Sequence, residues 1–280
     1  MNSRAHPEDV APGVVRLATM SRSALFGEPT NCYVVATELG GLVVDPGSDD
    51  EEFVGAVEAV VAELGGMAGM VVTHGHRDHW EGVARLWERH GGWVATHPAL
   101  VGRLAGIPPT THRLVREDHV LAGWRVLEVP GHTRDHIALW RPRDGVMLVG
   151  DVVAGRGTTV ISPPDGEMTA YLATLRRLRD LGPRLLLPGH GPPVARPREA
   201  LEALIRHRLA REEAVWAALD TRPRPLEELV ACVYADVPAE RWWLAEHSLL
   251  AHLLKLEAEG RAVRLEGGWA RSPAGRENTT

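Results

Sequence analysis

Short apolar runs of strand length alternate with amphipathic stretches over roughly the first 195 residues of the chain. Apolar runs that end at Gly, Pro or Asp are typical of buried strands followed by turns. They predict strands over residues 13–20, 31–37, 41–44, 70–72, 92–96, 124–129, 137–140, 146–149 and 184–187. Apolar residues at helical spacing predict helices between residues 49 and 64, 82 and 90, and 168 and 181. Strands mixed with helices in this way favour a layered α/β architecture.

The pattern changes after Pro192 and Pro193. A long amphipathic helix is predicted first, then shorter helices and a two-stranded hairpin, which together are typical of a winged-helix unit. These elements are predicted over residues 198–219, 226–234, 238–243, 245–260, 261–265 and 268–270. We therefore predict a larger domain at residues 1–195, a winged-helix-like domain at 196–270 and a disordered tail at 271–280.

Composition and charge narrow the classes of protein. The chain has 280 residues, 44% of them hydrophobic, and a formal net charge of −6, so a general attraction to nucleic acid or anionic membranes is not expected. The sequence has no apolar stretch near the roughly 18–20 residues that span a bilayer. The N-terminus does not resemble a secretory signal, and a cytoplasmic location without a membrane partner is expected. Cys32 and Cys232 lie in apolar contexts and are predicted to be two buried thiols.

The segment that follows the apolar run at residues 70–72 carries the strongest chemical signal. Three histidines and one aspartate, His74, His76, Asp78 and His79, lie within six residues. Imidazole and carboxylate are the usual ligands of zinc and similar divalent ions. A polar surface loop is the simpler alternative, but it does not explain this order of residues. Because one short segment cannot surround an ion, further ligands are expected from separate loops downstream.

Three later strand ends offer such ligands. His132, Asp151 and His190 each follow a predicted apolar strand and stand beside a glycine that permits a tight turn. Taken singly, the two histidines could be turn or loop residues and the aspartate a helix cap. Taken with the first motif, they favour a shared metal site.

In the order of these motifs the chain resembles the metallo-beta-lactamase superfamily. The resemblance rests on residues 73–79, 130–136, 150–151 and 188–191, and it covers roughly residues 10–195. It implies an α/β fold in which a four-layer αββα sandwich holds the metals at one edge of its paired sheets. It also implies a ligand set. The first metal would be bound by His74, His76 and His132. The second would be bound by Asp78, His79 and His190, and Asp151 would bridge both.

The physics of a two-metal site fits this assignment. Two divalent ions about 3.5 Å apart share a hydroxide whose pKa falls toward neutrality, and they clamp both oxygens of a displacement. A donor set rich in imidazole favours zinc, with iron or manganese as alternatives. Asp78 is placed to orient the hydroxide, so Asp78 and Asp151 are predicted to act in catalysis as well as in metal binding.

Supporting residues are less well determined by the sequence. Asp45 ends its strand and is a candidate to accept the outer N–H of a ligand imidazole, although a simple turn residue is an equal alternative. Thr133 and His136 match the pattern that the resemblance places beside the ligand His132. The bulky Trp80 stands where the superfamily usually has a small residue, and it either reshapes the pocket or packs under the loop.

The remaining segments resemble the lactamase-beta-two-like branch, which carries a C-terminal winged-helix domain and is related to glyoxalase II. Animal members of this branch include a mitochondrial endoribonuclease, and related enzymes act as thioesterases on acyl carriers. The resemblance rests on residues 155–161, 171–175, 187–192, 205–213 and 252–261. Within the first of these, Arg156, Thr158 and Thr159 could receive a substrate phosphate or form a hydrogen-bonded loop.

Three functions remain open at this point. The favoured one is a binuclear metal hydrolase that acts on a small or carrier-linked ester or thioester. The second is a single-strand-specific endoribonuclease, and the third is a nucleic-acid-binding or scaffolding protein with an idle metal site. Hydrolysis of a β-lactam is a weaker fourth.

A basic track along the C-terminal part would favour the RNA functions. Arg206, Arg208 and Arg211 share their predicted helix with Glu212 and Glu213, which is more typical of a salt-bridged face.

Overall fold

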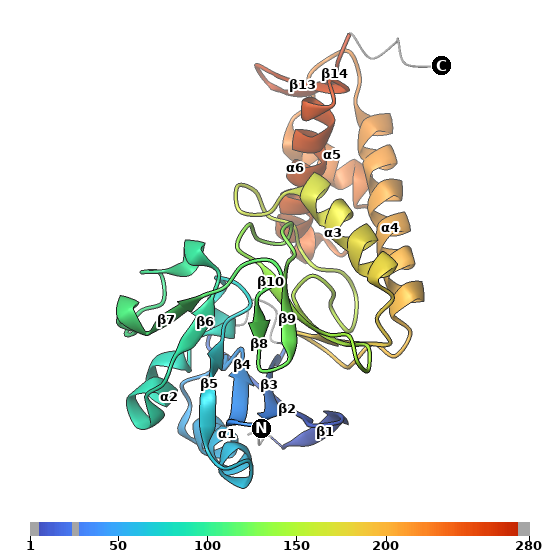
Figure 1. The fold of residues 1–280 in the computed structure, drawn as a ribbon. Coiled ribbons are helices and arrows are strands. Elements are labelled where there is room, and N and C mark those ends of the chain that lie inside the picture. The colour runs from blue at the N-terminus through green and yellow to red at the C-terminus, as the bar shows by residue number, and fades with distance from the viewer. Residues whose placement is uncertain (1–5, 24–27, 274–280) are drawn as a thin grey trace. The chain divides into compact units, whose positions relative to one another are not determined.

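A computed structural model describes residues 6–23 and 28–273 (Figure 1). The chain separates into two compact units. The first unit comprises Met1–Val129, Asp135–Thr158 and Leu181–Arg198, and the second comprises Pro130–Arg134, Thr159–Asp180 and Glu199–Thr280. The expected domain boundary between residues 195 and 196 stays a prediction, and residues 274–280 of the expected tail lie outside the described residues.

The first unit contains a mixed sheet, seven-stranded among the described residues. Its first four strands are antiparallel and its last four are parallel, so the fourth strand belongs to both parts. In the order of pairing the strands are β1 (Glu8–Ala11), β2 (Val14–Thr19), β3 (Thr30–Thr37), β4 (Gly40–Val44), β5 (Met67–Val71), β6 (Val94–Thr96) and β7 (His112–Leu114).

A second sheet of the same unit has five strands within the described part of the chain. Only the pair β11·β12 is parallel. In the order of pairing the strands are β12 (Leu185–Pro188), β11 (Val146–Gly150), β10 (Ile137–Arg141), β9 (Trp124–Glu128) and β8 (Val120–Leu121). Strands β10 and β11 are buried along their whole length, as expected of continuous apolar runs that are covered on both faces.

The two sheets of the first unit share a hydrophobic core. Leu42 and Val71 of the first sheet lie in one buried cluster with Val126 and Leu139 of the second. The opposite face of the first sheet is covered by α1 (Glu51–Glu63) and α2 (Val83–His90), whose apolar residues form a separate cluster with that sheet. The layered arrangement follows from strands that present apolar side chains to both faces.

Helix α1 shows how local sequence sets an element boundary. The side chain of Asp50 accepts hydrogen bonds from the backbone N–H groups of Glu52 and Phe53, which would otherwise be unsatisfied in the first turn. Buried Phe53, Val57 and Val61 recur at helical spacing and face the sheet.

The second unit is mainly helical. Its helices are α3 (Met168–Leu181), α4 (Pro197–Ala218), α5 (Leu226–Val233) and α6 (Trp242–Ala258), and its hairpin is β13 (Ala262–Leu265) with β14 (Gly268–Arg271). The last residue of α3 and the first two residues of α4 belong to the first unit. Leu229, Leu249, Leu253 and Trp269 belong to the buried cluster that joins the last two helices to the hairpin. Among the described residues, none of the helices has the length and apolar character needed to span a bilayer.

Most predicted elements are present within a few residues of their expected bounds, but three short strands were missed. β1, β7 and β8 have two to four residues each and lack a long apolar run. The prediction of two buried thiols is wrong for Cys232. Cys32 is buried, whereas Cys232 is exposed because α5 turns Leu229, Val230 and Val233 toward the core and leaves Cys232 off that stripe.

Candidate metal centre

Each candidate ligand lies at or shortly beyond the end of a strand. His74 and His76 follow β5, and the short 3-10 helix Arg77–His79 comes next. Asp151 follows β11, and His190 follows β12. Because β4·β5 and β11·β12 are parallel pairs, the ends of paired strands meet at the same edge of a sheet.

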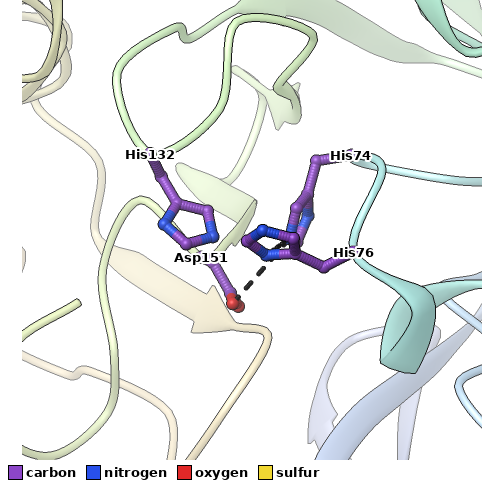
Figure 2. Close-up of side chains that lie close together, drawn as sticks. All are labelled: His74, His76, His132 and Asp151. Carbon is purple, nitrogen blue, oxygen red and sulfur yellow. Dashed lines mark hydrogen bonds and ion pairs between the residues drawn. The ribbon is translucent and has the colours of Figure 1, made fainter. Parts of the chain in front are cut away.

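One group of side chains gathers His74, His76, His132 and Asp151. Each offers one ligand atom, and these atoms all lie within 4.8 Å of one another. Figure 2 shows the three imidazole rings and the carboxylate turned toward a common point. The Nε2 atom of His74 lies 3.0 Å from Nδ1 of His76 and 3.9 Å from Oδ2 of Asp151. This group can hold a metal ion.

A second group gathers Asp78, His79 and His190, whose ligand atoms also lie within 4.8 Å of one another. The carboxylate of Asp151 lies beside this group as well. Its Oδ1 atom is 3.4 Å from Nε2 of His79, and its Oδ2 atom is 3.4 Å from Nε2 of His190. The Asp151 carboxylate therefore lies beside both groups of ligand atoms.

Hydrogen bonds at the outer ring nitrogens orient the imidazoles. The hydroxyl of Thr73 donates to Oδ2 of Asp45 at 2.7 Å, so its oxygen accepts from Nδ1 of His74 at 3.0 Å. Nδ1 of His79 donates to the same Asp45 carboxylate at 2.9 Å. In both rings Nδ1 therefore carries a proton. Nε2 of His74 presents a lone pair to the site, and Nε2 of His79 does so once its own proton is displaced.

Backbone carbonyls do the same for two further rings. Nδ1 of His132 donates to the carbonyl of Val160 at 2.9 Å, and Nδ1 of His190 donates to the carbonyl of Pro29 at 3.1 Å. Four imidazoles thus have an oxygen acceptor behind Nδ1, which is the arrangement that fixes the tautomer and the ring direction of metal-binding histidines.

Asp45 carries much of this arrangement. It lies 2.9 Å from Nδ1 of the candidate ligand His79, and its role as a supporting residue stays a prediction. It accepts bonds from the backbone N–H and the hydroxyl of Thr73 as well as from His79. Its φ of 52° lies in the left-handed region, which few residues other than glycine adopt. A buried carboxylate in a disfavoured backbone conformation is held by these three bonds.

The charges of the cluster are strongly coupled. Burial, reinforced by neighbouring imidazoles, lowers the pKa of His74 well below its usual value, so this ring is neutral. Burial alone would lower the pKa of His79, but Asp151 and Asp45 raise it well above its usual value. The pKa of His190 is lowered by burial and raised by Asp151 and Asp78, with a net rise to about 10.

The carboxylates respond in the opposite sense. Burial would raise the pKa of Asp151, but His79 and His190 hold it well below its usual value. Asp78 is likewise held below its usual pKa, because His190 and His79 outweigh the effect of burial. Without a metal, protonated imidazoles supply the positive charge that these two carboxylates require.

The residues present fit divalent cations. Nε2 of His79 is buried and makes no hydrogen bond among the described residues, although it faces two carboxylates. A metal ion would satisfy this atom and would replace the protons on His79 and His190. Mixed imidazole and carboxylate donors suit zinc, iron or manganese.

Some supporting residues were not anticipated from the sequence. Thr30 donates to Oδ2 of Asp78 at 3.0 Å, and Asn31 donates to the carbonyls of Pro188 and Gly191 on either side of His190. The only sequence signal for them is the presence of polar residues at the start of an otherwise apolar strand.

His136 and Thr133, expected beside His132, are both buried. Nε2 of His136 accepts the backbone N–H of Asp151 at 3.0 Å, and its ring stacks on His74 with 4.6 Å between centroids. The carbonyl of Thr133 accepts the N–H of Gly131 within the turn.

The remaining candidates lie outside both ligand groups. Arg156 and Thr158 are exposed and Thr159 is half-buried. Their role in substrate binding stays a prediction. Trp80 donates to the carbonyl of Gly75 at 3.1 Å and packs against the α1/α2 cluster, which supports the interpretation that it braces the loop.

The arginines of α4 do not form a basic track. Arg208 is buried, and Arg211 pairs with Asp236 and donates to the carbonyl of Val233. Arg206 is exposed.

Comparison with known proteins gives two family matches and relatives that align over most of the chain. The metallo-beta-lactamase superfamily matches residues 25–190, and the beta-lactamase associated winged helix domain matches residues 226–269. The chain is 27% identical to a beta-lactamase-like protein 2 homolog of Drosophila melanogaster over 267 residues, which covers 89% of each chain. It is 25% identical over 255 residues to an atrochrysone carboxyl ACP thioesterase of Aspergillus novofumigatus, covering 84% of this chain and 75% of that protein.

A solved structure extends the similarity to three dimensions. That of a beta-lactamase domain protein from Burkholderia ambifaria matches with a TM-score of 0.83 and 26% identity, over 97% of this chain and 95% of that one. The expected sandwich with a C-terminal winged-helix domain is confirmed, and so is the expected branch.

Proposed function

The chain belongs to the metallo-beta-lactamase superfamily and is a metal-dependent hydrolase, and we propose that it holds two zinc ions and hydrolyses esters or thioesters of small or carrier-linked acyl groups. The observation that carries this proposal is the position of Asp151 between two groups of ligand atoms. His74, His76 and His132 would hold one ion with Asp151. The second group would hold the other.

Two divalent ions held by these residues would polarise a carbonyl oxygen and lower the pKa of water, which is the chemistry that hydrolysis near neutral pH needs. The protein contributes the fixed directions of its own groups. Oxygen acceptors behind Nδ1 keep four rings aimed inward, and Asp45 does so for His79 with a negative charge.

Asp78 is proposed to orient the attacking water. The hydroxyl of Thr30 donates to its Oδ2 atom and restricts rotation of the carboxylate. Its pKa is held below the usual range, so Asp78 is ionised at neutral pH and acts as a hydrogen-bond acceptor. His136 accepts the backbone N–H of Asp151 and so holds the main chain that carries this residue.

The acyl substrate is proposed from the relatives and from the charge of the chain. The fungal relative is named as a thioesterase for an acyl group on a carrier protein. The formal net charge of −6 gives no general attraction to RNA, and Arg208 and Arg211 of the expected track are engaged in internal hydrogen bonds. The expected cytoplasmic location stays a prediction.

The test combines metal analysis with a substrate panel. The purified protein should contain about two zinc ions per chain, as expected for a binuclear hydrolase. It should hydrolyse at least one of a series of acyl thioesters and esters of increasing acyl length. Asp151→Ala and His76→Ala should abolish turnover without unfolding the protein, whereas Asp180→Ala, at an exposed carboxylate that pairs with Arg179, should leave turnover unchanged.

Labelled single-stranded RNA is incubated in parallel. Metal-dependent RNA cleavage that is lost in Asp78→Ala, without thioester or ester turnover, would replace the proposed function with that of an endoribonuclease. Protein that binds no metal and turns over nothing would instead support a scaffold with an idle site.

A further inference from the structure

Arg208 of α4 is buried in an unusual setting for an arginine. Its exposed fraction is 2%, whereas arginine side chains are rarely fully buried unless they are paired. Among the described residues it has no carboxylate within 4.0 Å, and its Nε atom makes no hydrogen bond. Its partners are the carbonyl of Thr159, to which Nη2 donates, and the ring of Tyr171, whose centroid lies 5.4 Å from Cζ.

The first partner leads to a candidate metal ligand. Thr159 immediately precedes Val160, and the carbonyl of Val160 accepts the Nδ1 proton of His132 at 2.9 Å. Two successive carbonyls of this segment therefore have different partners. That of Thr159 accepts from Arg208, and that of Val160 accepts from His132. All four residues belong to the second unit.

The second partner supports the turn that carries His132. A Cβ atom added to Gly131 would lie 2.3 Å from Cα of Tyr171, so α3 and the turn are in close contact. The hydroxyl of Thr174, one turn further along α3, donates to the carbonyl of Pro130 at 2.7 Å. Arg208 thus contacts both the helix behind His132 and the segment that binds its ring nitrogen.

We propose that Arg208 is a positioning residue for the first metal ion, and that it acts through Val160 to aim Nε2 of His132 at the ligand group. This inference rests on the proposed function. Burial of a charge without an ion pair is costly, so Arg208 is a poor device for stability alone. A planar guanidinium that donates to a carbonyl and lies over an aromatic ring instead fixes the orientation of the groups it contacts.

The matched control lies one turn along the same helix. Arg211 also donates to a backbone carbonyl, that of Val233, and its Cζ atom lies 4.7 Å from the ring centroid of Tyr234. Arg211→Met therefore removes the same kinds of contact as Arg208→Met, together with the ion pair to Asp236, from the α5 side of α4. These contacts do not involve the segment that holds His132.

The experiment measures zinc affinity of the metal-free full chain by competition with a chelator. Arg208→Met is expected to weaken binding of one zinc ion about 10-fold, the lower end of the effect of losing an outer partner of a ligand, because Arg208 acts on His132 only through the neighbouring carbonyl. Arg208→Lys, which can still donate to Thr159, should recover most of this loss, and Arg211→Met should bind both ions as the unsubstituted chain does. Should Arg208→Met not fold, Arg208→Leu provides the same comparison, because leucine also has no donor for Thr159.

Combining Arg208→Met with a second substitution tests whether its effect on zinc affinity is exerted through His132. In His190→Ala, which keeps the first ligand group, Arg208→Met should weaken zinc binding by the same factor. In His132→Ala it should have no further effect, because the two residues act on one ligand. The role of Arg208 would be refuted if Arg208→Met lowered zinc affinity equally in both backgrounds, or if Arg208→Met by itself left zinc affinity unchanged. Either result would leave the proposed function standing. Failure of the unsubstituted chain to bind zinc would refute the proposed function and this role with it.

Discussion

Gly189 lies where the packing around the proposed metal centre leaves no room for a side chain. A Cβ atom at this position would lie 2.3 Å from Oδ1 of Asp151 and 2.7 Å from Cε1 of His79. Ordinary contacts begin near 3.4 Å, so Gly189→Ala must displace the Asp151 carboxylate by about 1 Å and the His79 ring by somewhat less. The backbone of Gly189 does not have a positive φ, so alanine adds no conformational strain of its own.

A displacement of about 1 Å in a catalytic group can lower the rate about 100-fold. Gly189→Ala is therefore expected to lower kcat/KM toward the best substrate by about that factor, with weaker zinc binding, while the metal-free chain still folds. Zinc content, competition titration and steady-state kinetics measure these effects. Gly55→Ala in α1 is the control, because its new Cβ has nothing within 4 Å. Unchanged zinc affinity and kinetics in Gly189→Ala would show that Asp151 and His79 are not held as argued.

Three further outcomes are expected. Asp45→Ala should weaken zinc binding about 10–100-fold because Nδ1 of His79 loses its acceptor, and chelator titration would detect it. Dialysis against a chelator should abolish hydrolysis and zinc should restore it, and full activity in metal-free protein would contradict the mechanism. Burial raises the pKa of Glu212, but His252 and Lys255 hold it below the usual value. A depressed carboxylate stabilises the fold above its unfolded pKa and loses this effect as the pH falls, so the Tm difference between Glu212→Gln and the unsubstituted chain should shrink below about pH 4.5.

The sequence was sufficient to predict where the candidate ligands would lie. His74 and His76 come from one motif, and Asp151 and His190 end apolar strands, so the parallel pairs bring them to sheet edges. Asp45 could be proposed as a partner for the same reason. What allowed these predictions is that strand ends are visible in the hydrophobic pattern.

The backbone partners could not be predicted in this way. The carbonyls of Val160 and Pro29 carry no side-chain signal, and each is distant in sequence from the histidine that it binds. The burial of Arg208 was also not foreseen. Its helix reads as a charged face, and only the fold shows that Arg208 turns toward Tyr171 while Arg206 is exposed.

These partners explain why ligand identity alone does not define a metal centre in this chain. Each of four imidazoles needs an oxygen behind Nδ1, and the oxygens come from four separate segments that include Thr73, Asp45, Val160 and Pro29. If one acceptor shifts, the ring it holds is free to rotate. Its proton can then move from Nδ1 to Nε2, because either nitrogen can carry it. Metal affinity is therefore expected to respond to substitutions far from the histidine motif, and to respond separately for the two ions according to which ring loses its acceptor.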